Sequence, residues 1–137
     1  MYACGLMARS HEDIEGYLNQ LERRFERLEN GTYLVSSGPN LPPIALRIAQ
    51  PVVVAQVEIV RCPAAENGDA ARLFRRLLEL NASDLMHAAY AIENSVVVLA
   101  AARELDTLDI NELEAVFADI SMALSEHVPA LRQLVNS

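Results

Sequence analysis

Residues 96–117 read VVVLAAARELDTLDINELEAVF, and this stretch joins a strand to the start of a helix. The run from Val96 to Ala102 is apolar at successive positions, which is typical of a strand that is buried on both faces. Asp109 is followed three residues later by Glu112, the spacing of a capping box at a helix N-terminus. The stretch therefore predicts a central or interfacial strand, a short connection and a helix that packs on the sheet.

The helix after Asp109 has one apolar face, because its apolar residues recur every three or four positions. Pro129 should kink or end this helix near residue 128, since proline lacks the amide donor that a helix interior needs. The apolar positions are Leu113, Val116, Phe117, Ile120, Leu124, Val128 and Leu131.

A second helix is predicted upstream over residues 69–80, where leucines and Phe74 alternate with arginines. Residues 88–92 and 95–103 then flank Glu93-Asn94, which predicts two strands joined by a tight hairpin turn.

The N-terminal half predicts one helix and three strands. Residues 10–29 have a helical apolar stripe that Asn30-Gly31 should end, and its members are Ile14, Tyr17, Leu18, Leu21, Phe25 and Leu28. Strands are expected at residues 32–37, 44–49 and 52–62. The predicted order is α-β-β-β-α-β-β-α, a two-layer α+β fold in which an antiparallel sheet is covered by helices. A chain of 137 residues suits a single domain over 1–137.

The composition narrows the class of partner. The net charge is −8, and all 11 basic residues are arginine. An acidic surface repels phosphate backbones, so we expect no nucleic-acid partner. It favours basic or amphipathic polypeptides instead, although the charge is equally well explained as a means of keeping the protein soluble.

We expect a cytoplasmic protein without membrane insertion, because the sequence has no signal peptide and no apolar run of membrane-spanning length. The two cysteines, Cys4 and Cys62, form neither a disulfide framework nor a metal motif. No metal site and no cofactor is predicted.

The sequence indicates no catalytic residues. His11, His87 and His127 lie far apart on different predicted elements, and the glycines form no phosphate-binding loop. A remote alternative is a cryptic enzyme, which would need Cys62 and His87 to meet in one cleft.

The C-terminal half has a pattern of short motifs. Leu77-Leu78-Glu79-Leu80-Asn81 closes the second helix, a hairpin follows, and Leu105-Asp106-Thr107-Leu108-Asp109 leads into the last helix. This pattern, from Leu77 to Val135, resembles the type III secretion chaperone-like superfamily, which includes the Tir chaperone (CesT) family and the YbjN-like family.

The resemblance implies a non-catalytic homodimer whose partner is an unidentified protein client. In such chaperones a client segment wraps around the dimer in extended form, adding strands to sheet edges and apolar side chains to surface pockets. The expected dimer interface comprises Val52, Val54, Leu73, Leu77, Val96 and Val98. The expected client-binding residues are Tyr17, Leu21, Phe25, Tyr33 and Val35.

An alternative function is that of a YbjN-like regulatory or scaffold domain that binds one dedicated protein without any role in export. The sequence does not separate this alternative from the client-binding chaperone, because both use the same fold.

Overall fold

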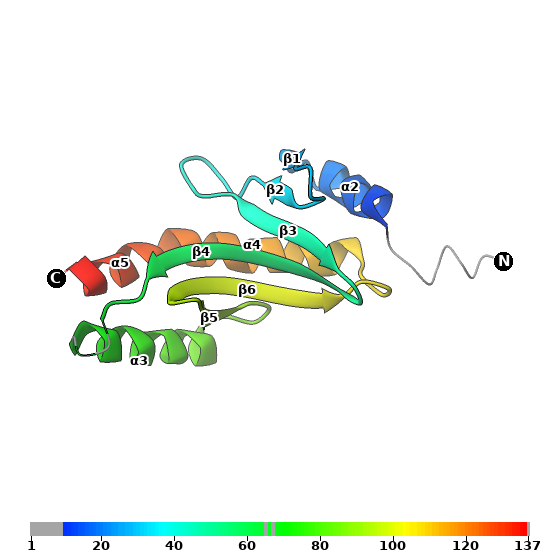
Figure 1. Ribbon diagram of the computed structural model, residues 1–137. Helices are drawn as coiled ribbons and strands as arrows, with labels where there is room; N and C mark the ends of the chain where they lie inside the picture. Colours follow the sequence, from blue (N-terminus) through cyan, green and yellow to red (C-terminus); the bar gives the residue numbers. More distant parts are fainter. Residues whose placement is uncertain (1–9, 65, 67, 137) are drawn as a thin grey trace.

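A six-stranded antiparallel sheet forms the centre of the protein in the computed structural model, which describes residues 10–64, 66 and 68–136 (Figure 1). The strand order is β1-β2-β3-β4-β6-β5, so β1 and β5 are the edges. The strands are β1 (Phe25–Arg27), β2 (Tyr33–Val35), β3 (Ile44–Ala49), β4 (Val52–Arg61), β5 (Ala89–Glu93) and β6 (Val96–Glu104).

Four helices are described: α2 (His11–Gln20), α3 (Gly68–Ser83), α4 (Ile110–Glu126) and α5 (Val128–Asn136). In Figure 1, α4 runs along the sheet, α3 lies beside β5, and α2 lies at the β1–β2 end. The predicted capping box at Asp109 is confirmed, and Ser10 forms a second one with Asp13 at the start of α2. The predicted α+β architecture is therefore confirmed.

The two faces of the sheet differ in burial. Residues paired across antiparallel strands point to the same face, and β4 directs Val53, Ala55, Val57 and Ile59 to the helices, where they are buried. The opposite face consists of small or polar side chains such as Val54, Gln56 and Ala102, and most of them are half-buried or exposed. Among the residues described, no helix packs on this open face.

The first predicted helix is too long, which is a correction. The helix ends at Gln20, and Glu22 adopts a left-handed φ of 57°, which reverses the chain. Residues 25–27 then form the edge strand β1, which pairs with β2. The pairing places the Phe25 ring 5.7 Å from the Tyr33 ring, and such tertiary contacts outweigh the weak helical preference of the segment.

Asn30-Gly31 does not end a helix but forms the turn between β1 and β2. Gly31 has a φ of 88°, and the amide of Leu28 donates to the carbonyl of Thr32 across the turn. Asn-Gly is a strong hairpin signal. With β1 added, the order of elements over the described residues is α-β-β-β-β-α-β-β-α-α.

Of two other boundaries, one shifts and one lies as predicted. The β5–β6 turn is Asn94-Ser95, one residue later than predicted, and both residues have positive φ, as a two-residue hairpin turn requires. Pro129 separates α4 from α5 as predicted, since α4 ends at Glu126 and α5 begins at Val128.

Candidate functional site

A polar network anchors α2 to the β1–β2 hairpin. The Tyr33 hydroxyl donates to Oε2 of Glu15 at 2.8 Å and lies 2.8 Å from Nδ1 of His11. Arg27 on β1 contacts the same Glu15 oxygen at 3.2 Å, and its guanidinium lies over the Tyr33 ring. Burial, together with the hydrogen bond and negative charge of Glu15, raises the pKa of Tyr33 to about 12. The hydroxyl is therefore neutral at ordinary pH and links β2 to α2, while the Arg27–Glu15 pair links β1 to α2.

The expected client-binding residues gather at this end of the molecule, at two depths. Tyr33 and Val35 are fully buried, so their side chains pack in the core and offer no free surface. Tyr17, Leu21 and Phe25 are half-buried at the rim of the core. The rim adjoins a groove of about 330 Å³ that Phe25 lines together with Leu34, Leu41 and Pro43.

Among the residues described, no hydrogen bond reaches the outer side of the β1 backbone. The amide of Leu28 donates to Thr32, and the amide of Ser36 donates to Arg24, so Arg24 and Leu28 face β2. Because antiparallel pairing alternates, the N–H and C=O groups of Phe25 and Arg27 point away from β2. This edge has the unpaired backbone groups that an added strand requires.

The expected dimer residues fall on two separate surfaces. Leu73 and Leu77 face inward from α3 and are buried in the core. Val52, Val54 and Val96 lie half-buried on the open face of the sheet, where Val98 is also placed but is buried. The structure of one chain does not bring these six residues together.

An apolar surface on α3 and β5 escaped sequence reasoning. Leu78 is 69% exposed and Ile92 is 51% exposed, and both line a groove of about 300 Å³ with Phe74 and Ala91. The signal was the excess of apolar residues in residues 73–80, which exceeds what one helical stripe can bury. We call Phe74, Leu78, Ala91 and Ile92 the α3–β5 surface.

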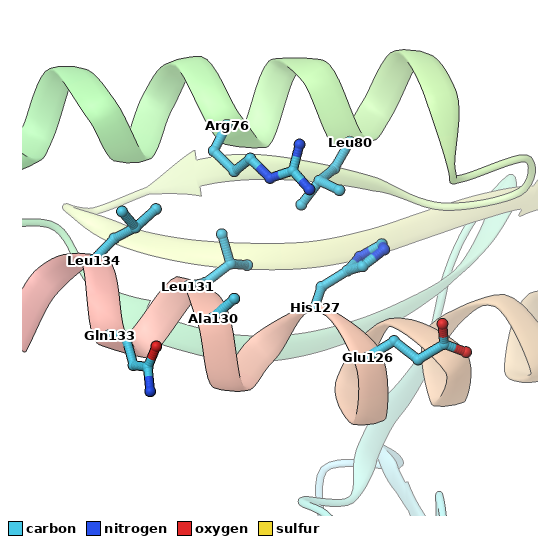
Figure 2. Close-up of a pocket in the computed structure, with 8 residues that line it drawn as sticks. All are labelled: Arg76, Leu80, Glu126, His127, Ala130, Leu131, Gln133 and Leu134. Carbon is cyan, nitrogen blue, oxygen red and sulfur yellow. The ribbon is translucent and has the colours of Figure 1, made fainter.

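A third groove, of about 380 Å³, lies between α3 and α5 (Figure 2). Leu80 and Leu131 point toward each other across it, whereas Gln133 points away. Arg76, which also lines it, is already paired with Glu79 at 3.6 Å. The groove is a seam between packed helices, and its polar groups do not converge on a ligand.

Cys62 and His87, the two residues that a cryptic enzyme would need in one cleft, do not meet. The Cys62 amide bonds to Ser95, whereas His87 lies 3.0 Å from Arg103. Arg103 lies eight positions after Ser95 along β6, a span of roughly 25 Å at the strand rise. Cys4 lies outside the described residues. Within residues 10–64, 66 and 68–136, no group of three or more potential metal ligands occurs.

Comparison with known proteins identifies the family. The CesT_Tir_1 family model matches residues 7–137. No curated protein matches the chain in sequence. In the described part of the chain, no helix has the length and hydropathy of a membrane span.

Solved structures show the same fold at low identity. A chain in the heterodimeric ExoU–SpcU complex from the type III secretion system of Pseudomonas aeruginosa is 19% identical, with a TM-score of 0.68 over 88% of this chain and 98% of that one. YbjN from E. coli is 14% identical, with a TM-score of 0.63 over 86% and 90%. A chain from the Yersinia pestis secretion chaperone SycH, in complex with a YscM2 fragment, is 14% identical, with a TM-score of 0.54 over 84% and 99%. The family and fold are those of non-catalytic secretion chaperones, and the chain belongs to the CesT_Tir_1 family of the type III secretion chaperone-like superfamily.

Proposed function

We propose that this protein is a non-catalytic, cytoplasmic, dimeric chaperone-like protein that holds an extended segment of a protein client. The family match supports this function over that of a YbjN-like regulatory domain. Two of the similar structures are complexes with a protein partner, ExoU–SpcU and SycH with a fragment of YscM2.

The single observation that carries the client proposal is the open β1 edge beside a half-buried apolar rim. Phe25 and Arg27 offer outward backbone groups, and Leu21, Tyr17 and Phe25 offer apolar contact next to them. An added strand gains affinity from main-chain hydrogen bonds and specificity from pockets for alternate side chains. Within the proposal, Tyr33 and Val35 act from the core by holding β2 in register.

For the dimer we propose the α3–β5 surface with a second copy of this chain as its occupant. Arg75 and Glu79 lie one turn apart on α3, on either side of Leu78, and they form an exposed pair at 3.3 Å. In a two-fold contact, residue i of one copy meets residue j of the other and the reverse. Two antiparallel α3 helices that cross at the level of residue 77, next to Leu78, would therefore set Arg75 of each copy against Glu79 of the other. Leu77 contributes to this interface from beneath the groove.

The client proposal is tested by comparing Arg27→Pro with Arg27→Ala. Both substitutions remove the guanidinium and its contact with Glu15, but only proline also removes the outward amide. Proline is tolerated on an edge strand where the amide faces solvent. The tagged proteins are used to capture partners from a lysate of the source cells, and the captured client is then purified and titrated against each variant.

We expect Arg27→Ala to keep the client and Arg27→Pro to lose it, with a protease-protected client segment in the wild-type complex. If circular dichroism shows that Arg27→Pro is folded and both variants bind the client equally well, the client does not add a strand to β1. Absence of any stoichiometric client would contradict the chaperone function itself.

A further inference from the structure

The two edges of the sheet differ in how their backbone groups are satisfied. At β5, the amide of Tyr90 donates to Oδ1 of Asn81 at 2.7 Å, and Nδ2 of Asn81 donates to the carbonyl of Tyr90 at 3.1 Å. One side-chain amide from α3 thus makes both hydrogen bonds that a neighbouring strand would make to Tyr90.

The backbone direction of β5 follows from its hairpin. Glu93 and Val96 flank the two-residue turn and face each other, so Ala88, Tyr90 and Ile92 direct their backbone groups outward. The Ala88 amide donates to Oδ2 of Asp119 on α4 at 2.9 Å. The same oxygen accepts from the amides of Met86 and His87. Of the outward amides at Ala88, which precedes β5, and at Tyr90 and Ile92 on it, the first two are therefore bound by side chains of the protein.

We propose that Asn81 closes the β5 edge and confines strand addition by a partner to the β1 edge. This inference rests on the proposed function, because it assigns the client strand to one of two edges. Asn81 is the decisive residue, since it lies between the outward groups of Ala88 and Ile92 and interrupts the edge at its middle. In the proposed dimer, the two copies therefore contact each other through side chains of the α3–β5 surface, and their sheets do not join into one continuous sheet.

The closure is separable from a purely structural role of Asn81. A residue that only fixes α3 to the sheet would change stability when replaced, without creating a new surface for association. A residue that closes an edge, when replaced by an apolar side chain of similar size, frees the backbone groups of Tyr90. Together with the outward groups of Ile92, they template edge-to-edge pairing.

The test compares wild-type protein with Asn81→Leu and, as the control, Asp119→Asn. Amide hydrogen exchange followed by NMR in dilute wild-type protein should show protected amides at Ala88 and Tyr90 and rapid exchange at Phe25 and Arg27. In dilute Asn81→Leu, exchange at Tyr90 should be about tenfold faster, the effect of losing one ordinary hydrogen bond. Light scattering at rising concentration should then show species larger than the wild-type assembly for Asn81→Leu only, because Asp119→Asn leaves Tyr90 covered.

Folded Asn81→Leu that keeps the wild-type mass at every concentration would overturn the proposal. If Asn81→Leu does not fold, the wild-type exchange pattern decides: protected Phe25 and Arg27 amides with an exchanging Tyr90 amide would overturn it. None of these measurements uses a client, so their failure leaves the proposed function to be judged by the capture experiment.

Discussion

The Nε2 atom of His127 lies 3.0 Å from Oδ2 of Asp84, although 43 residues separate them in the chain. The other ring nitrogen, Nδ1, lies 2.9 Å from the Tyr90 hydroxyl. His127 is the C-terminal cap of α4, Asp84 follows α3, and Tyr90 is on β5. The imidazole therefore joins the α4–α5 junction to both sides of the α3–β5 connection, and this junction supports the α3–β5 surface.

We expect His127→Ala to lower the free energy of unfolding by about 2 kcal/mol, because the buried Tyr90 hydroxyl loses its partner. Urea denaturation of His127→Ala, Tyr90→Phe and the double variant checks this. The double variant should cost less than the sum of the single ones, since the two groups share one contact. Strict additivity would show that the contact contributes nothing.

The same variant has an effect on Asp84. Two hydrogen bonds hold the pKa of the Asp84 carboxyl below its usual value. The bond from Ser83 has the larger effect, and the bond from His127 has the next largest. Such a group stabilises the fold above its unfolded-state pKa, and this contribution is lost as the pH falls through the folded-state pKa. In His127→Ala the Asp84 pKa should rise part of the way to its usual value, as NMR titration would show. An unchanged pKa would mean that His127 does not bind the carboxylate.

Tyr33 should affect stability in alkali. Its pKa of about 12 in the fold exceeds the ordinary value of 10.0, so its stabilising contribution is complete below pH 10 and is lost as the pH rises through about 12. Tyr33→Phe should cost about 1–2 kcal/mol at pH 8, because the bond to Glu15 is lost. The cost should shrink toward pH 12 in urea denaturation. A cost that does not change with pH would contradict the neutral buried hydroxyl.

The dimer surface is tested by mass. Wild-type protein should sediment at twice the chain mass of 15.1 kDa, and Leu78→Arg should sediment as a monomer, because the leucine is exposed in one chain and its loss leaves the core intact. Ala102→Arg is the control, since it places the same charge beside Val54 on the open face of the sheet. If only Ala102→Arg dissociates the dimer, the interface lies on the open face of the sheet and not on the α3–β5 surface. A wild-type protein that sediments as a monomer would contradict the proposed dimer.

Charge reversal on α3 tests the geometry of the pair. Arg75→Glu and Glu79→Arg should each weaken the dimer, and the double variant should restore it, because every Arg–Glu contact between copies is then exchanged. Equilibrium sedimentation measures the dissociation constant of each protein. A double variant as weak as the single ones would contradict the antiparallel arrangement of the two α3 helices.

Local sequence determined the secondary structure wherever one segment carried its own signal. The β3 strand and the capping box at Asp109 follow from alternation and from a spacing of three residues, which depend on neighbouring positions only. The motif from Leu77 to Val135 likewise led to the right family, because a pattern of element ends and apolar positions records the fold. The excess of leucines on α3 was a further local signal, because it gives this helix more apolar surface than one chain buries, although the sequence prediction did not use it.

Tertiary structure decided what long-range pairing controls. Residues 22–29 have a helical pattern, yet the gain from pairing Phe25 with Val35 and from the edge-to-face contact of Phe25 with Tyr33 converts them to a turn and an edge strand. The sequence also did not determine which candidate residues are buried. Tyr33 is fully buried and Phe25 only partly, and this difference arises when α2 packs on the sheet. The sequence by itself determined the family and every described helix and strand except the end of α2 and strand β1, since these rest on local patterns. Only the three-dimensional arrangement decided that β1 is an open edge and that Asn81 reaches Tyr90, because those contacts join segments that the chain keeps apart.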